Sequence, residues 1–155
     1  MGPINSMPML IYDILFFVFL MPFVVAGLYY SNNETFSCLN QTFPGMSVPF
    51  YSWLRIDSWI MLGFAISAIM NVFQLCICLA TYCSYVMWLI SKIIFILWRL
   101  AWLIVGSVLF WKHIYPGNPC GSPIRGYMWA NLIIGFIHII ITVIFMILYK
   151  PDPLV

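Results

Sequence analysis

Long uncharged stretches, separated by a few charged residues, dominate the pattern of this chain. They cover residues 14–33, 58–91, 93–111 and 126–149, and the third is interrupted only by Arg99. A membrane-spanning helix needs about 20 mainly apolar residues, which rise about 1.5 Å each. Each stretch is therefore long enough to cross a bilayer once, and the second is long enough to hold a connection as well.

This pattern predicts an all-α polytopic membrane protein, a single domain of residues 1–155 with four transmembrane helices in a bundle. The expected helices cover about residues 9–30, 55–80, 90–112 and 127–149. The expected outer loops cover about residues 31–53 and 113–126, and a tight connection around residues 81–85 joins the second helix to the third.

Composition agrees with a chain that is solvated by lipid. Hydrophobic residues make up 65% of the 155 residues and charged residues only 6%, so a water-soluble fold would have too little polar surface. The formal net charge of +2 is small and scattered, and it gives no argument for nucleic acid as a partner. The bilayer itself is the first expected partner.

Two N-glycosylation sequons in the first long loop indicate the orientation. Asn33-Glu34-Thr35 and Asn40-Gln41-Thr42 both have the acceptor pattern, whereas the lysines and arginines do not favour either side. Glycosylation of Asn33 and Asn40 would place this loop and the loop between the third and fourth helices on the lumenal or extracellular side. We therefore expect cytosolic termini and a location in the secretory pathway or plasma membrane.

The same topology sorts the five cysteines. Cys38 and Cys120 fall in the two outer loops, where an oxidising environment would allow a disulfide between them. Pairing between subunits is the alternative. Cys76, Cys78 and Cys83 fall near the inner face without the spacing of a zinc or redox motif, so we interpret them as buried thiols, with reversible palmitoylation of Cys83 as the alternative.

Polar side chains inside the predicted spans are the candidate functional residues, because ionisable groups in hydrocarbon cost a few kcal/mol each. They are Asp13, Asn71, Arg99 and His138. Arg99 and His138 should lie at similar depth, where they would line a pore or cavity. The favoured interpretation is structural: Arg99 extends toward the inner interface or pairs with Asp13. For His138, one interhelical hydrogen bond is favoured over a proton relay.

Residues at the outer ends of the helices have the features of interfacial anchors and helix contacts. Arg55 and Asp57 are two residues apart and cannot share a helical face, so each should pair elsewhere, with anchoring at the interface as the expected role. Aromatic belts are expected from Trp53, Trp59, Trp111 and Trp129 at the outer level and from Trp88 at the inner level. Close helix contacts are expected at Gly27, Gly63 with Ser67, Gly106 and Gly135.

The two halves of the chain resemble each other. Pro49 and Pro123, and likewise Asp57 and Asn131, are separated by one common offset of 74 residues. This offset is suggestive of a duplicated helical hairpin.

Short motifs in both halves resemble the transmembrane protein 272-like family of small four-span proteins. The motifs are Met21-Pro22 with Val24-Val25-Ala26-Gly27-Leu28-Tyr29, Cys38 with Pro49-Phe50-Tyr51, and Trp102-Leu103-Ile104-Val105-Gly106-Ser107-Val108 followed by Ile114-Tyr115-Pro116, Cys120 and Tyr127. The resemblance covers most of the chain from about Leu20 onward. It implies a four-helix fold, and it brings no catalytic or ligand-binding residues with it.

The functional hypothesis is a non-enzymatic tetraspan that acts by association. The sequence has no paired carboxylates, HExxH, GxSxG or phosphate-binding loop, so we expect no catalytic residues, metal or cofactor. The protein would be a self-assembling subunit or an accessory subunit of a larger membrane complex. The alternative is an oligomeric channel subunit with a pore lined by Arg99, His138, Asn71 or Gln74.

The orientation is testable by electrophoretic mobility. Replacement of both Asn33 and Asn40 by Gln is expected to abolish a glycosidase-sensitive mass shift, because these two sequons are the expected acceptors. Each single replacement should remove part of the shift. A wild-type protein whose mobility does not change with glycosidase would contradict the proposed orientation.

Overall fold

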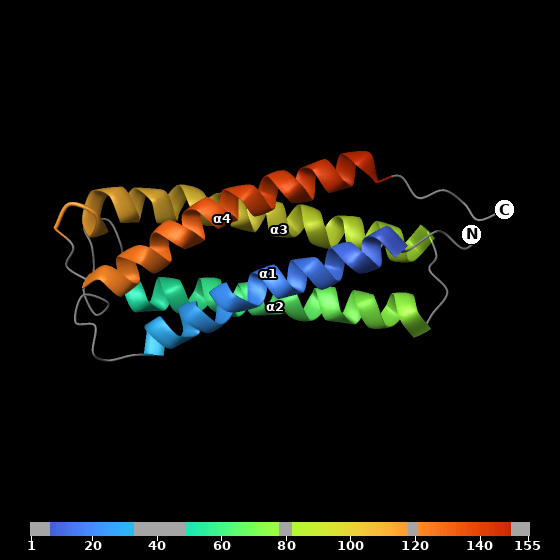
Figure 1. Cartoon of the computed structure of the whole chain (residues 1–155), viewed down its shortest axis with the longest axis horizontal. Helices are drawn as coiled ribbons and strands as arrows, with labels where there is room; N and C mark the ends of the chain where they lie inside the picture. The colour runs from blue at the N-terminus through green and yellow to red at the C-terminus, as the bar shows by residue number, and fades with distance from the viewer. Residues whose placement is uncertain (1–6, 33–48, 78–81, 118–120, 150–155) are drawn as a thin grey trace.

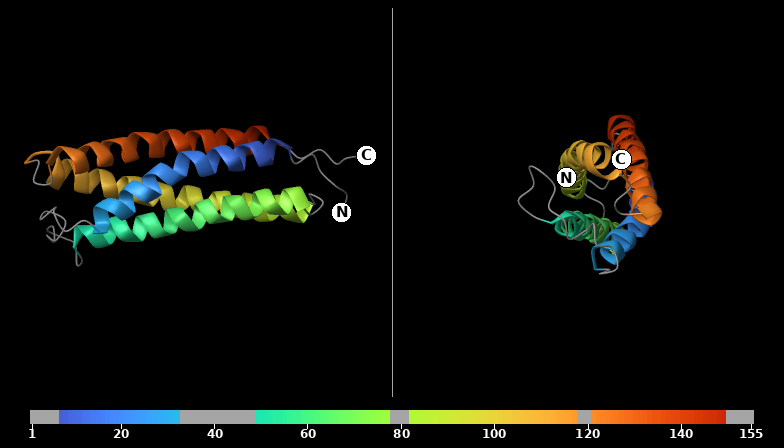
Figure 2. Two further views of the ribbon diagram at one scale, coloured as in Figure 1. Left: turned by 60° about the horizontal axis from the view of Figure 1, so that its bottom comes forward. Right: turned by 90° about the vertical axis from the view of Figure 1, so that its left-hand side faces the viewer.

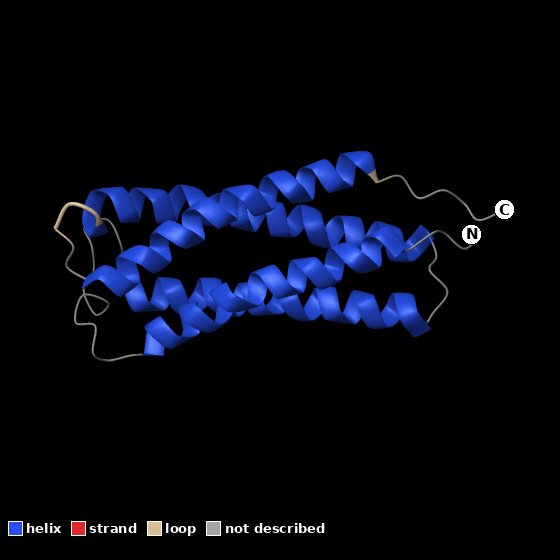
Figure 3. Ribbon diagram, in the orientation of Figure 1, coloured by secondary structure: helices blue, strands red, loops and turns tan. Residues whose placement is uncertain are grey.

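A computed structural model describes residues 7–32, 49–77, 82–117 and 121–149, and nearly all of them are helical (Figures 1 and 3). The four α-helices are α1 (Met7–Asn32), α2 (Phe50–Ile77), α3 (Tyr82–Leu109) and α4 (Gly121–Leu148). A π-helical turn, η2 (Phe110–Ile114), follows α3 directly. The described residues contain no strand, so the prediction of an all-α bundle is confirmed.

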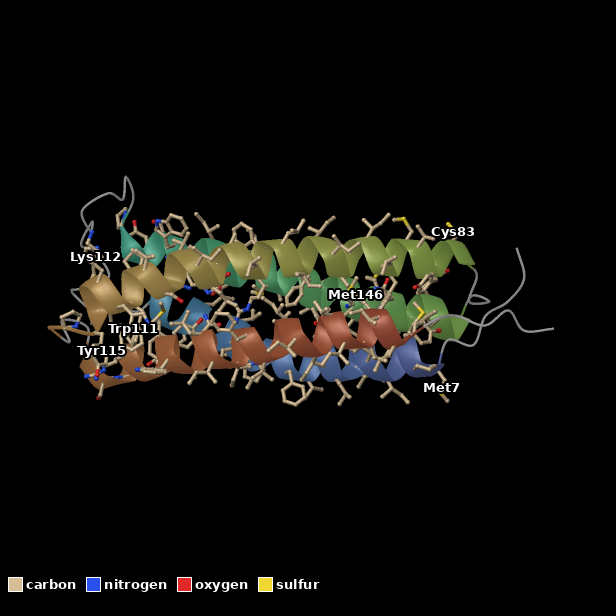
Figure 4. All side chains as sticks on the ribbon, turned by 90° about the horizontal axis from the view of Figure 1, so that it is seen from above. Met7, Cys83, Trp111, Lys112, Tyr115 and Met146 are labelled. Atoms are coloured by element: carbon tan, nitrogen blue, oxygen red, sulfur yellow. The ribbon has the colours of Figure 1, made fainter. Side chains whose placement is uncertain are left out.

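The helices form an up-and-down bundle. Viewed along its length, the bundle has α1 beside α2 and α3 beside α4, with α2 next to α3 and α1 next to α4 (Figure 2). Met7 of α1 and Cys83 of α3 lie at one end, and Trp111, Lys112 and Tyr115 lie at the other (Figure 4). The segments between α1 and α2 and between α3 and α4 therefore join helix ends at the same end of the bundle.

All four helices are long and apolar enough to span a membrane. They have 26 to 28 residues, which corresponds to about 39 to 42 Å at 1.5 Å per residue and exceeds a hydrocarbon core of about 30 Å. Large apolar side chains are exposed along every helix, as expected where lipid is the solvent. The protein is an integral membrane protein with four candidate spans.

Buried positions repeat every three or four residues, which is the spacing that places side chains on one face of a helix. In α1 the buried face consists of Met9, Tyr12, Asp13, Phe16, Leu20, Val24, Gly27 and Ser31. In α3 and η2 the buried face includes Trp88, Lys92, Phe95, Arg99, Trp102, Leu103, Leu109, Phe110 and Ile114. The inward faces contain both the aromatic side chains and the charged ones, and the outward faces are mostly aliphatic.

Three helices begin earlier than the sequence predicted. Helix α2 begins at Phe50, α3 at Tyr82 and α4 at Gly121, whereas the expected starts were about residues 55, 90 and 127. The expected connection around residues 81–85 and the expected outer loop at 113–126 are therefore partly helical. The physical reason is that helices continue beyond the hydrocarbon, and Pro49 and Pro123 lie beside helix starts, where a proline is tolerated.

Two glycines allow the helices to approach closely. A Cβ atom at Gly27 would overlap Ser58 Oγ of α2 and lie 2.7 Å from the Tyr127 hydroxyl of α4. A Cβ atom at Gly135 would lie 2.9 Å from Nη2 of Arg99. These two predicted close contacts are confirmed, and at both positions a side chain would displace a buried polar group.

The other two glycines make no close helix contact within this chain, and a contact of Gly63 with another subunit stays a prediction. A Cβ atom at Gly106 would make only ordinary contacts, the nearest at 3.6 Å, and a Cβ atom at Gly63 would meet no atom within 4 Å. Gly63 therefore faces open space on the outside of this chain.

Gly27→Ala is expected to lower the free energy of unfolding by about 1–3 kcal/mol, because the added methyl group overpacks the junction with α2 and α4. Gly126→Ala is the matched control, since a Cβ atom there has nothing within 4 Å. Thermal unfolding in detergent measures both. Equal melting temperatures for the two variants would contradict the close approach at Gly27.

Candidate functional site

Among the described residues, four charged side chains lie inside the bundle, away from the lipid-facing surface. The relative exposures are 0% for Asp13, 3% for Asp57 and 2% for both Lys92 and Arg99. The two acids come from α1 and α2, and both bases come from α3. Lys92 and Arg99 are seven residues apart, so they lie two turns apart on the same face of α3.

The pair nearer the end of the bundle with Met7 and Cys83, here called the inner end, joins α1 to α3. Lys92 Nζ lies 2.7 Å from Asp13 Oδ1, and the indole N–H of Trp88 donates to the same oxygen at 3.2 Å. The ammonium also lies 3.8 Å from the centre of the Phe16 ring, which gives a cation–π contact. The Lys92 charge is therefore compensated by a carboxylate and by an aromatic face.

A neutral hydrogen-bond chain lies beside this pair and joins α1 to α4. The Thr142 hydroxyl donates to the carbonyl oxygen of His138 at 2.7 Å, so the Tyr12 hydroxyl, 2.7 Å away, is the donor to Thr142. At the inner ends of α2 and α3, the Gln74 amide donates to the Ser84 hydroxyl at 3.1 Å.

The outer pair connects α3 to both α2 and α4. Arg99 Nη1 lies 3.8 Å from Asp57 Oδ2, and the indole N–H of Trp98 donates to the other Asp57 oxygen at 3.2 Å. Arg99 Nη2 donates to the backbone carbonyl of Asn131 at 3.2 Å and to the side-chain oxygen of the same residue. One guanidinium thus holds three helices together.

The expected pairing of Arg99 with Asp13, or its extension toward the inner interface, is wrong. Asp13 is bonded to Lys92, which lies only two residues inside the helix that the sequence predicted from about residue 90. Because α3 begins at Tyr82, Lys92 is ten residues inside the helix, at the depth of Asp13. Arg99 lies two turns farther out and pairs with Asp57 instead.

Asp57 is also not the interfacial anchor that was expected. It is buried, and its carboxylate faces Arg99 in the interior. Arg55 does lie at the exposed end, where it donates to the Asn32 side chain at 2.6 Å and to the Ser31 carbonyl at 3.2 Å. The prediction that Arg55 and Asp57 pair with different partners is confirmed.

The tryptophans predicted for the aromatic belts differ in exposure, and Trp53 of the outer set is half-buried with its ring stacked on Trp102. Trp59, Trp111 and Trp129 are exposed, and the last two rings contact each other at 5.6 Å. Trp88 is buried beside Asp13 rather than exposed at the inner interface. Its indole N–H has a carboxylate partner in the interior, which is why it is not at the membrane surface.

His138 lies between the two charged layers. Its ring contacts Phe16 at 4.8 Å and Phe95 at 5.2 Å between centroids. The neighbouring turn of α4 contacts Arg99 through Gly135, so His138 and Arg99 lie within about one turn of each other in depth. The expected interhelical hydrogen bond is not formed, since no hydrogen bond to the His138 ring occurs within the described residues.

Several buried donors in the described part of the chain have no hydrogen-bond partner. They are Trp53 Nε1, Arg99 Nε, Trp102 Nε1 and Asn131 Nδ2. Asn71, a predicted polar residue of the interior, is partly buried in α2. Its side-chain amide interacts with the Asp13 carboxylate, so α2 also contacts the Asp13–Lys92 pair.

The described residues contain no group of three His, Cys, Asp or Glu side chains that could hold a metal ion. The two buried carboxylates belong to separate layers, and each faces its own cation. Chemically, this arrangement supplies charge pairing and hydrogen bonds between helices. Asn33, Asn40, Cys38 and Cys120 lie outside the described residues, so the glycosylation sites and the disulfide stay predictions.

Comparison of the chain with protein-family models, with curated proteins and with solved structures found no match. The functional interpretation therefore depends on the geometry of the bundle and on its sequence.

Lys92 and Asp57 are the two members of the buried charge set that the sequence analysis did not place in the interior. The spacing of Lys92 and Arg99 contained this information, because two bases seven residues apart on one span share a face. No comparable spacing marks Asp57, which lies only seven residues from the start of α2.

The inner ion pair is expected to show strong coupling. Asp13→Asn or Lys92→Met alone should lower the free energy of unfolding by about 3–5 kcal/mol, because each leaves one buried charge without its partner. The double variant should lose less than the sum of the two, which unfolding titrations in mixed detergent micelles can measure. Arg55→Met is the exposed control, with an expected loss of at most about 1 kcal/mol. Additive losses for Asp13 and Lys92 would contradict the pairing.

Proposed function

We propose that this protein is a non-enzymatic four-helix membrane protein that acts by association with other transmembrane helices. It would be a self-assembling subunit or an accessory subunit of a larger membrane complex. The observation that supports this proposal most directly is an open groove on the lipid-facing side of α2 and α3.

The groove has a volume of about 390 Å³ and runs between the two helices. Small residues form part of its surface: Gly63 and Ser67 on α2, and Ser91 on α3. The hydroxyls of Ser67 and Ser91 lie 3.3 Å apart, and apolar side chains such as Ile60 and Ile94 flank them. The groove thus combines a shallow floor with apolar walls.

Such a surface suits a partner helix in lipid. Helices in a bilayer gain no hydrophobic free energy from contact, so they associate through close packing and interhelical hydrogen bonds. Gly63 and Ser67 have the small-xxx-small spacing that lets another backbone approach, and a serine hydroxyl can bond across the contact. The closed interior strengthens this proposal, because the buried charges already have partners within the chain.

The alternative of a pore between several copies has less support. Arg99 faces the interior of its own bundle and is bonded to Asp57 and Asn131, so it does not lie on a surface that copies could share. Gln74 is exposed, but it lies at the inner end and is bonded to Ser84. The residues expected to line such a pore therefore do not form one outer face.

We propose further that both termini are cytosolic and that the protein belongs to the secretory pathway or plasma membrane. The two sequons support this orientation, together with the described helix ends that flank both longer connections, which lie at one end of the bundle. A disulfide between Cys38 and Cys120, which is also a proposal, would join these two connections. Membership in the transmembrane protein 272-like family is likewise a proposal, supported by the motifs quoted above.

The association is testable with two matched glycines. Gly63→Phe is expected to shift the protein from assembly toward monomer, because a large ring would occupy the groove. Gly126→Phe is the control, since both glycines have open space at the Cβ position and the second lies on α4, away from the groove. Native mass measurement in mild detergent reports the assembly state.

Two results would contradict the proposal. One is a wild-type protein that is a stable lone monomer in native membranes and mild detergent, without a co-purifying membrane subunit. The other is an assembly that responds equally to Gly63→Phe and Gly126→Phe. A bilayer conductance that changes with Arg99→Ala would favour the channel alternative instead.

A further inference from the structure

A second hollow lies between α1 and α4, on a different side of the bundle from the α2–α3 groove. It has a volume of about 340 Å³, which is within the range of small-molecule pockets. Its walls are almost entirely apolar and come from both helices. Tyr12, Phe16 and His138 contribute its aromatic surface, and polar atoms form almost none of the lining.

The pocket opens sideways toward the lipid. Leu15 and Phe19 of α1 and Ile137 of α4 line it, and these side chains are 51%, 60% and 49% exposed on the outer surface of the bundle. Phe16, in contrast, is buried at its inner wall. A molecule dissolved in the bilayer could therefore enter between α1 and α4 without passing through water.

His138 is the only lining side chain that offers an unused hydrogen-bonding group. The Tyr12 hydroxyl is committed to Thr142 at 2.7 Å, and within the described residues no group bonds to the His138 ring. An uncharged imidazole carries one N–H donor and one acceptor nitrogen. A polar group left without a partner in an apolar environment costs free energy, so a ligand that meets this need gains affinity.

The depth of His138 limits what can reach it. It lies about 15 Å from the end of α4 at Leu148 and about 26 Å from the start at Gly121, at 1.5 Å per residue. With a hydrocarbon core of about 30 Å centred on the helix, the ring is about 9 Å inside the nearer boundary. Charged headgroups remain at the interface, so the partner of this ring must be an uncharged group.

The nearest cations do not change this conclusion. Lys92 is separated from the pocket by Phe16, whose ring centre is 3.8 Å from the ammonium, and Lys92 is bonded to Asp13. Arg99 is bonded to Asn131 and faces Asp57. Neither lines the pocket, so an anionic ligand would find no partner there.

We propose that the pocket between α1 and α4 binds an uncharged, lipid-soluble molecule whose hydroxyl or carbonyl oxygen hydrogen-bonds to the His138 ring. The aliphatic and aromatic walls hold its apolar body, and the ring fixes its oxygen. The site would make this protein a binder of a lipophilic molecule drawn from within the bilayer. This function is independent of helix association, because the groove and the pocket lie on different helix pairs.

The test uses two photoreactive probes and purified protein in phosphatidylcholine nanodiscs. One probe is a diazirine-bearing long-chain ketone with its carbonyl at mid-chain, and the other is the matched alkane with the same diazirine. Mass spectrometry locates the labelled residues. The ketone is expected to label α1 and α4 around the pocket more strongly than the alkane does.

Three variants separate the contributions of the ring and the cavity. His138→Leu should lower ketone labelling about tenfold, the change expected from one lost hydrogen bond, and leave alkane labelling unchanged. Ile137→Trp should lower labelling by both probes, because the indole fills the pocket. Ile140→Trp is the control on the same helix, since Ile140 is exposed to lipid but does not line the pocket.

The outcomes are decisive in either direction. Equal labelling by ketone and alkane in the wild type would show that the pocket takes an acyl chain only, and it would overturn the role of His138. Unchanged labelling in Ile137→Trp would overturn the pocket itself. This test does not depend on whether His138→Leu folds. A Gly63→Phe monomer that still takes up the ketone would separate this site from the association surface.

Discussion

The burial of four charged side chains in a lipid-solvated bundle is the constraint that determines how these helices pack. Hydrocarbon offers no water to an ammonium or a carboxylate, so each charge must find its partner on another helix. Helix α3 carries both cations on one face, and α1 and α2 carry one anion each. The rotation of α3 about its axis is therefore fixed at two levels, and Asn131 places α4 against the same guanidinium. Apolar packing alone would not select this rotation, because lipid-facing and inward-facing side chains are equally apolar.

The interior contacts agree with the internal repeat suggested by the sequence. Between α1 and α3, positions at an offset of 79 residues contact each other: Asp13 contacts Lys92, and Phe16 contacts Phe95. Between α2 and α4, positions at an offset of 74 residues share a partner on α3. Asp57 and Asn131 both face Arg99, and Phe64 and His138 both contact Phe95. Two similar hairpins packed about an approximate two-fold axis would produce this set of contacts. In such an arrangement one diagonal joins α1 to α3, and α2 and α4 flank it. At the inner level the repeat-related positions hold an acid and a base, Asp13 and Lys92, and at the outer level they hold an acid and an amide, Asp57 and Asn131.

The fold was predictable from the sequence because hydrocarbon thickness fixes the length of an apolar stretch, and four such stretches occur. The interior was less predictable. Amphipathic periodicity identifies the buried face of a helix in water, but here both faces are apolar, and only polar residues mark the interior. Arg99 and Asp13 were identified in this way. Lys92 was not, because the expected start of α3 at about residue 90 left it beside the helix end, whereas α3 begins at Tyr82. The partners of Arg99 depend on the relative heights of four helices, and these heights follow from the complete set of contacts rather than from any local pattern.

Because the charges are satisfied within one chain, recognition by this protein has to come from the surface that faces lipid. That surface is uniformly apolar, so differences in shape and single polar groups carry the information. Between α2 and α3 the small side chains of Gly63, Ser67 and Ser91 leave an open groove, which suits the ridge of another helix. Between α1 and α4 the larger side chains leave a deeper pocket with one imidazole, which suits a small molecule better than a helix. The groove lies inward of the Asp57–Arg99 pair that joins α2 to α3. The pocket lies between α1 and α4, which the Tyr12–Thr142 hydrogen bond joins.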